Sequence, residues 1–318
     1  MVGRVHLAVD VGATWTRLAV AVDEVFVKKV VVRTPREGGR LAVAEEVART
    51  FEKEFKEYRE KVEAVGIGTI GPLDMRRGVV VNTPNLPLGT FELKRPLEDF
   101  FNRPVYVVND AVAGVLAEKY YGEGVGYNNL VYVTISTGVG GGVIVDGRVI
   151  LGKDGNAHEI GHIVVNYDSG LRCGCGGYGH WEAYAGGANI PRLAKYVAER
   201  NPSVVKVSVI GEKAASGSLE PREVFEAARR GDPLGRLIVD EIVKASAAGL
   251  ASVINAYDPE YVSIGGSVFL HNTDLLYQPV VEIVKKNIVV RPPVIAPTKL
   301  GDDVVLYGAL ALAVYRPV

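Results

Sequence analysis

Two segments of this chain repeat one strand–turn–strand pattern, and this repeat constrains the fold more than any other feature. Residues 7–23 read LAVDVGATWTRLAVAVD and residues 130–146 read LVYVTISTGVGGGVIVD, so Thr14 falls opposite Thr137 and both segments end on aspartate. Elsewhere strand-like and helical patterns alternate, which is typical of an α/β protein. The repeat predicts two similar α/β halves that face each other across a cleft, a preferred place for a ligand. A chance likeness between two β-hairpins is the alternative interpretation.

Hydrophobic periodicity predicts the other elements. Further strands are expected at residues 26–32, 64–68, 105–108 and 261–264. Helices are expected at residues 41–62, 111–121, 193–199, 221–230, 234–257, 274–289 and 308–315. The glycine-rich segment 153–187 is expected to be irregular.

Charge and hydropathy limit the classes of partner. Lysine and arginine number 36 against 37 acidic residues, which leaves a net charge of −1. Without a basic excess the chain is not expected to bind nucleic acid. No apolar run approaches the roughly 18 residues of a membrane helix, and no signal-peptide pattern opens the chain, so we expect a cytoplasmic protein. Gln278 is the sole glutamine, and such scarcity of thermolabile residues indicates a thermophile.

Two turns rich in small residues are candidates for phosphate binding. Residues 12–14 and 137–142 would let backbone N–H groups approach phosphate oxygens closely, and Asp10 could hold hydrated Mg²⁺ beside the first turn. Glycine turns are also common in ordinary hairpins. The chain has no G-x-x-x-x-G-K-[ST] motif, and Val143 stands where a G-x-G-x-x-G fingerprint needs glycine. A P-loop and a dinucleotide fingerprint are therefore excluded.

Asn109 and Asp110 directly follow the strand expected at residues 105–108. The carboxyl end of a strand is where ligand sites open in α/β folds. There an aspartate can accept the proton of a hydroxyl that attacks a phosphoryl group. The alternative is that Asn109 or Asp110 only caps the following helix. The two interpretations are compatible.

A short glycine-rich segment concentrates residues that ligate metals. It contains His158, Glu159, His162, Cys173, Cys175 and His180. His162, Cys173, Cys175 and His180 would make a Cys₂His₂ set for a tetrahedral structural Zn²⁺. The C-x-C spacing differs from the usual C-x₂-C, and a surface loop with incidental histidines is the alternative. Glu182, just beyond, is either a surface acid or an acceptor for sugar hydroxyls.

From about residue 7 to its C-terminal helix the chain resembles the ROK family of repressors and sugar kinases. The shared motifs are Asp10-x-Gly12-x-Thr14, Gly71-Pro72, Asn85-Leu86-Pro87, Asn109-Asp110, residues 137–142, Glu159-Ile160-Gly161-His162 and Cys173-Gly174-Cys175-Gly176. The E-x-G-H motif followed by C-x-C-G is highly specific. Within the family the chain is most similar to glucokinases and broad-specificity hexokinases of hyperthermophilic archaea.

The resemblance implies the two-domain actin-like ATPase fold of actin, Hsp70 and hexokinases, with ATP and sugar in the interdomain cleft. Residues 1–118 and 302–318 would form a small α/β domain, and residues 119–301 a large one that carries the zinc loop. The implied activity is ATP-dependent phosphorylation of a hexose 6-hydroxyl, with glucose expected first. Mannose, fructose and N-acetylhexosamine are alternatives, as is a non-catalytic sugar-sensing regulator. Asp10 lies so near the N-terminus that a preceding DNA-binding domain is not expected. A homodimer is compatible with the family.

The resemblance also assigns roles to single residues. Asp110 would be the catalytic base. The other sugar-binding residues would be Gly71, Asn85, Asn109, Glu159, His162 and Glu182. The nucleotide-binding residues would be Asp10, Gly12, Ala13, Thr14, Thr137, Gly138, Gly265 and Gly266. The ligands of a structural Zn²⁺ would be His162, Cys173, Cys175 and His180. Two positions depart from the family pattern, because His180 replaces its usual third cysteine and Ala13 replaces a glycine.

Overall fold

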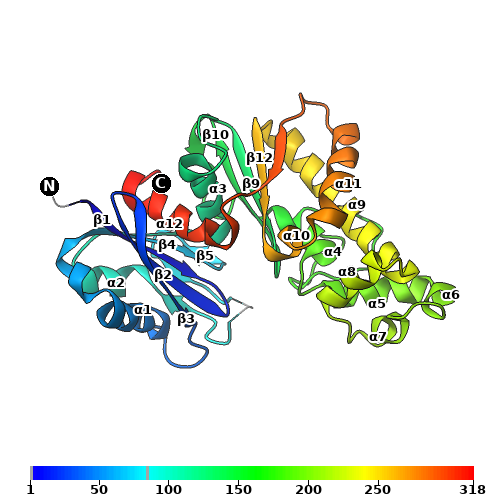
Figure 1. The fold of residues 1–318 in the computed structure, drawn as a ribbon, viewed down its shortest axis with the longest axis horizontal. Helices are drawn as coiled ribbons and strands as arrows, with labels where there is room; N and C mark the ends of the chain where they lie inside the picture. The colour runs from blue at the N-terminus through cyan, green and yellow to red at the C-terminus, as the bar shows by residue number, and fades with distance from the viewer. Residues whose placement is uncertain (1–2, 84–85) are drawn as a thin grey trace. The chain divides into compact units, whose positions relative to one another are not determined.

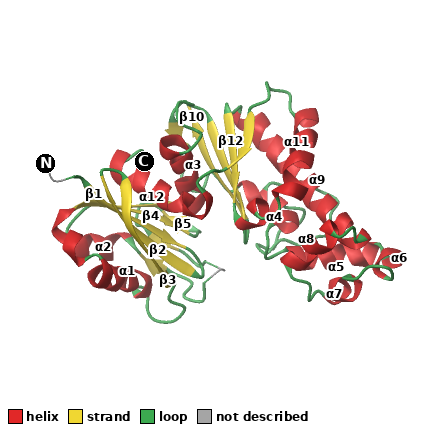
Figure 2. Ribbon diagram, in the orientation of Figure 1, coloured by secondary structure: helices red, strands yellow, loops and turns green. Residues whose placement is uncertain are grey.

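The computed structural model describes residues 3–83 and 86–318, and its chain divides into two compact units (Figures 1 and 2). Unit 1 comprises Met1–Tyr132, Gly142–His158 and Thr298–Val318, and unit 2 comprises Val133–Gly141 and Glu159–Pro297. The sequence boundaries expected after residues 118 and 301 stay a prediction.

Unit 1 is built on a five-stranded sheet of order β3-β2-β1-β4-β8. Its strands are β1 (Val5–Val11), β2 (Trp15–Val22), β3 (Val25–Arg33), β4 (Val62–Thr69) and β8 (Val105–Asn109). The first three strands pair antiparallel, while β4 and β8 continue the sheet in parallel to β1. Every residue of β1 is buried, as expected for a central strand covered on both faces.

Helices cover both faces of this sheet (Figure 1). The helices are α1 (Ala42–Glu54), α2 (Lys94–Phe101), α3 (Asp110–Tyr121) and α12 (Val304–Tyr315). Leu7 belongs to the core that α1 and α2 close, whereas its neighbour Ala8 packs against α12, because successive strand residues face opposite sides. The approach of α12 is close. A Cβ at Gly66 would lie 1.8 Å from the Ala309 oxygen, and one at Gly308 would lie 1.8 Å from the Ala113 oxygen.

A second five-stranded sheet has the order β11-β10-β9-β12-β13. Its strands are β9 (Leu130–Ile135), β10 (Val139–Val145), β11 (Arg148–Val149), β12 (Tyr261–Gly265) and β13 (Val294–Pro297). The two sheets share one topology. In the first sheet β1 lies between β2 and β4, and in the second sheet β9 lies between β10 and β12. Asp23 and Asp146, which end the two repeated segments, both have positive φ angles, 49° and 50°. The shared topology is what the internal repeat predicts.

The other helices of the chain lie in unit 2. They are α4 (Trp181–Ala185), α5 (Ile190–Arg200), α6 (Pro202–Val205), α7 (Gly211–Ser216), α8 (Pro221–Arg229), α9 (Pro233–Tyr257), α10 (Ser267–Leu270) and α11 (Thr273–Asn287). The small elements of unit 1 are β5 (Leu73–Asp74), β6 (Val79–Val80), β7 (Phe91–Glu92) and the 3₁₀ turns η1 (Lys56–Lys61) and η3 (Gly301–Asp303). The 3₁₀ turn η2 (Ile160–His162) lies in unit 2. None of the helices in the two described ranges combines the length and apolar character needed to span a bilayer.

Two sequence predictions of secondary structure were wrong. The segment 153–187, expected to be irregular, contains helix α4, and the helix expected at residues 41–62 is too long. The helix expected at residues 41–62 ends at Glu54, and the chain continues through the 3₁₀ turn η1. Val62 instead begins β4, where it is buried and pairs with Val5 of β1. Tertiary pairing with a strand far away in the sequence overrides the local helical pattern.

Candidate active site

Unit 1 places Asp110 at the junction between β8 and α3. The Ala111 N–H donates to Asn109 Oδ1 at 2.9 Å and to Asp110 Oδ1 at 2.8 Å. Asn109 is therefore the N-cap of α3, and the capping interpretation is confirmed for it. Gly71 lies beside the same group, because a Cβ there would be 3.2 Å from Asn109 Nδ2. Asn85, another expected sugar ligand, lies outside the described residues.

The first small-residue turn closes the β1–β2 hairpin of unit 1. Gly12 N–H donates to the Trp15 oxygen at 3.0 Å, and the Thr34 hydroxyl donates to the Gly12 oxygen at 2.8 Å. Thr14 is exposed, and Ala13 packs partly against the core. These bonds hold the turn with the Thr14 side chain in solvent.

Asp10 is the last residue but one of β1 and is 5% exposed. The Arg17 guanidinium donates to its Oδ2 at 2.7 Å. Burial raises the pKa of the Asp10 carboxyl to about 6, although Arg17 acts in the opposite direction. The ionised form of Asp10 therefore destabilises the folded protein. Ionisable groups with pKa values shifted in this way are common at functional sites.

The second turn, residues 136–139, lies in unit 2 between β9 and β10, and we call it the phosphate turn. Its backbone is bonded to the segment after α4: Gly187 N–H donates to the Ser136 oxygen at 2.7 Å, and Ala188 N–H to the Thr137 oxygen at 3.0 Å. Gly266, which directly follows β12, packs closely against the end of β9. It has a φ of 89°, and a Cβ there would lie 2.4 Å from the Ile135 oxygen. Only glycine fits this position.

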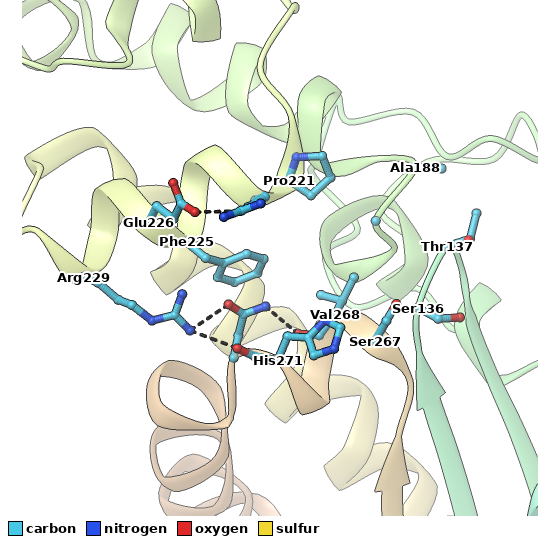
Figure 3. A pocket seen from close by; sticks show the side chains of 13 residues that line it. Ser136, Thr137, Ala188, Pro221, Phe225, Glu226, Arg229, Ser267, Val268 and His271 are labelled. Atoms are coloured by element: carbon cyan, nitrogen blue, oxygen red, sulfur yellow. Dashed lines mark hydrogen bonds and ion pairs between the residues drawn. The ribbon is translucent and has the colours of Figure 1, made fainter. Parts of the chain in front are cut away.

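A cavity of about 610 Å³ opens beside the phosphate turn within unit 2 (Figure 3). Its lining combines the turn, the segment after α4, helix α8 and helix α10. The lining residues are Ser136, Thr137, Gly187, Ala188, Pro221, Arg222, Phe225, Glu226, Arg229, Ser267, Val268, His271 and Asn272. Phe225 and Val268 supply apolar surface, and polar groups surround them. This mixture suits a flat ring that carries hydrogen-bonding edges.

Arg229 fixes one wall of this cavity (Figure 3). Its guanidinium donates to both oxygens of Asp274 at 2.7 Å and to Asn272 Oδ1 at 2.9 Å. Bidentate pairs of this kind hold a side chain in one geometry. Sequence reasoning missed the cavity residues other than Thr137. A nearby signal existed for Ser136, which precedes Thr137, and for Ser267 and Val268, which follow Gly265 and Gly266.

The four predicted metal ligands converge in unit 2. The donor atoms of His162, Cys173, Cys175 and His180 all lie within 4.8 Å of one another. Cys175 Sγ is 3.3 Å from His180 Nδ1, and Cys173 Sγ is 4.0 Å from His162 Nδ1. The remaining histidine of the segment does not join them, because His158 Nε2 bonds to the Gly155 oxygen at 2.8 Å.

The chemistry of these four donors fits a zinc ion. Burial raises the pKa of the Cys173 thiol to about 12, against a backbone hydrogen bond from Cys175 and with the Cys175 side chain and Glu182 adding to the shift, so a thiolate there needs a cation beside it. Burial, followed by His162, lowers the pKa of His180, which favours the neutral imidazole that ligates metals. Two sulfurs and two nitrogens are a common set for a closed tetrahedral zinc site.

The sugar-binding candidates of unit 2 surround this cluster. His162 directs Nδ1 toward Cys173, while its Nε2 lies 3.6 Å from Glu159 Oε2. Glu182 Oε2 accepts a hydrogen bond from Val139 N–H at 3.0 Å, and its Oε1 lies 3.6 Å from Cys173 Sγ. His162, Glu159 and Glu182 are thus brought together around the metal cluster and the phosphate turn.

The comparisons with known proteins agree on one family. The model of the ROK family matches residues 6–316. A glucokinase from Pyrobaculum calidifontis is 43% identical, over 98% of this chain and 96% of the relative. The structure of a ROK hexokinase from Thermus thermophilus has a TM-score of 0.84 and 34% identity, over 98% of both chains. A ROK family glucokinase from Streptomyces griseus, solved with glucose and AMPPNP, has a TM-score of 0.76 and 31% identity, over 97% of this chain and 99% of that one.

Proposed function

The chain belongs to the ROK family, and from that premise we propose that it transfers a phosphoryl group from ATP to the 6-hydroxyl of glucose. It has the actin-like ATPase fold of the ROK sugar kinases, and full-length likeness to glucokinases makes it an ATP-dependent sugar kinase. The observation that carries the proposal for this chain is the position of Asp110. Its carboxyl stands at the first turn of α3, in contact with the backbone that Asn109 caps.

The proposed chemistry assigns the proton transfer to Asp110. Its carboxylate accepts the proton of the sugar 6-hydroxyl as that oxygen bonds to the γ-phosphorus of ATP, while the bond from that phosphorus to the β–γ bridging oxygen breaks and ADP leaves. Asn109 orients the Asp110 backbone through the shared Ala111 N–H, and its amide, with the Gly71 backbone, binds sugar hydroxyls. Within unit 2 the same role falls to Glu159, His162 and Glu182. Positioning of this kind supplies much of the rate in phosphoryl transfer.

ATP is proposed to bind through its nucleoside in the cavity of unit 2. The aromatic ring of Phe225 and the side chain of Val268 give apolar faces for an adenine ring. Backbone N–H groups of the phosphate turn and of residues 12–14 then bind phosphate oxygens. Magnesium, when bound with ATP, neutralises phosphate charge, and Asp10 is the residue proposed to hold its water shell.

The proposed Zn²⁺ is structural, because four protein ligands leave it no open position. Its ligation through His162 Nδ1 would fix the tautomer of the ring and leave Nε2 as a defined donor toward a sugar hydroxyl. Glu159, 3.6 Å from that nitrogen, then helps to orient the ring. Reduced cysteine ligands and the use of ATP both support a cytoplasmic location.

A coupled assay tests the proposal. Purified protein receives Mg²⁺-ATP and either glucose, mannose, fructose or N-acetylglucosamine, and ADP release is followed. Glucose 6-phosphate is identified separately by a dehydrogenase specific for it. We expect turnover of glucose with phosphate on O6. A protein that phosphorylates none of these hexoses refutes the proposal, whereas a clear preference for another one changes only the substrate.

A further inference from the structure

The carboxylate of Glu182 faces two different groups within unit 2. One oxygen, Oε2, accepts the Val139 N–H bond at 3.0 Å, and Val139 ends the phosphate turn. The other oxygen, Oε1, faces Cys173 of the metal cluster at 3.6 Å. The side chain is half-buried. A residue that served only the sugar would not need a bond to the nucleotide side of the unit.

The phosphate turn is shaped around this carboxylate. A Cβ at Gly138 would lie 2.5 Å from Glu182 Oε2, so any side chain at position 138 would displace the carboxylate. The opposite side of the turn is equally tight, because a Cβ at Gly161 would lie 2.1 Å from the Val139 oxygen. The Val139 residue is thus held between the Glu182 carboxylate and the backbone of η2.

Helix α4 and the residues after it make further hydrogen bonds to the phosphate turn. It begins just after His180, one of the cluster residues, and ends where Gly186 N–H donates to the Glu182 oxygen at 3.0 Å. The next two residues donate to the oxygens of Ser136 and Thr137. Three hydrogen bonds therefore join a five-residue helix and its continuation to one short turn.

We propose that Glu182 is a positioning residue for the phosphate turn, in addition to any contact that it makes with sugar. A carboxylate is repelled by nucleotide phosphates, so Glu182 acts through the Val139 N–H and not as a phosphate ligand. Its charge strengthens that hydrogen bond and orders the turn before the nucleotide arrives. The inference rests on the proposed function in one respect, which is that the cavity beside the turn takes ATP.

Nucleotide binding without sugar separates this role from sugar binding. Titration calorimetry measures the Kd of Mg²⁺-AMPPNP for wild type, Glu182→Ala, Glu182→Asp and Glu182→Gln in the absence of any hexose. Glu182→Ala is expected to raise Kd about tenfold, the contribution of one hydrogen bond to a charged group. Glu182→Asp, whose carboxylate is one methylene short of Val139, should raise Kd several-fold. Glu182→Gln keeps an acceptor oxygen without the charge and should recover part of the affinity.

Glu159→Ala is the matched control, because it removes a proposed sugar contact that does not reach the turn. It should raise the glucose KM and leave the Kd for AMPPNP unchanged. Metal content and circular dichroism verify that each variant keeps its cluster and its fold. If Glu182→Ala does not fold, Glu182→Asp decides in its place. A Kd within twofold of wild type for the deciding variant overturns the inference. Wild type that binds no AMPPNP overturns the proposed function instead.

Discussion

The buried carboxyl of Asp10 gives the chain a measurable pH dependence of stability. Burial raises the pKa of this group from an ordinary 3.8 to about 6, with Arg17 opposing the shift and Asp303 adding to it. Between those values the folded protein keeps a proton that the unfolded chain has released. The group's contribution to stability is therefore complete below pH 3.8 and is lost as the pH rises through 6. Asp10→Asn removes this titration.

The magnitude follows from the two pKa values. A shift of about two units corresponds to about 3 kcal/mol over the whole range. The loss between pH 5 and pH 7.5 integrates to about 1.4 kcal/mol, most of it below pH 6. Arg17 stays charged over this pH range. The loss of its partner therefore changes the unfolding free energy of Asp10→Asn by an amount that does not depend on pH. The unfolding free energy of Asp10→Asn minus that of wild type should thus increase by about 1.4 kcal/mol from pH 5 to pH 7.5.

Guanidinium unfolding at pH 5.0, 6.0 and 7.5 and constant ionic strength measures this difference, once reversibility and coincident transitions have been checked. Asp99→Asn, on the exposed side of α2, removes an aspartate outside the core and is the matched control. A difference that stays flat or decreases as the pH rises would refute the reasoning, because it would mean that the folded protein does not hold the extra proton.

Three further predictions concern catalysis, the metal and packing. Asp110→Asn should lower kcat about 100-fold or more while glucose affinity, measured by calorimetry, changes little; near-normal kcat would remove Asp110 from the mechanism. Cys175→Ser should lose stoichiometric zinc by elemental analysis, lower the Tm and raise the KM for glucose more than that for ATP. Wild type without bound zinc would contradict that site. Gly308→Ala, whose Cβ would lie 1.8 Å from the Ala113 oxygen, should cost about 1–3 kcal/mol of unfolding free energy, and an unchanged Tm would show that α3 and α12 can separate freely.

The fold was predictable where local pattern and tertiary pairing agree. Both arms of the repeated hairpin are apolar, and β9 has the bounds that its sequence predicts, Leu130–Ile135. The helix expected to reach residue 62 failed because its last residue, Val62, pairs with Val5. Periodicity in one window carries no information about a partner strand elsewhere in the sequence.

The same limit applies to the functional site. Cys173, Cys175 and His180 lie close in sequence, so their convergence with His162 could be predicted. The cavity could not, because Phe225 lies on an amphipathic helix, far in sequence from Thr137. Its local pattern is that of any core residue. The bond from Val139 to Glu182 also depends on packing alone.

Helix α12 affects the order in which the protein can fold during translation. Its Leu306, Ala309 and Leu310 cover the face of the first sheet that carries Ala8 and Ala19, yet they are translated after the whole of unit 2. While unit 2 is being translated, the strands of the first sheet therefore lack the part of their apolar cover that α12 supplies. A chain truncated before residue 304 keeps that apolar surface exposed, and we expect it to aggregate more readily than the whole chain.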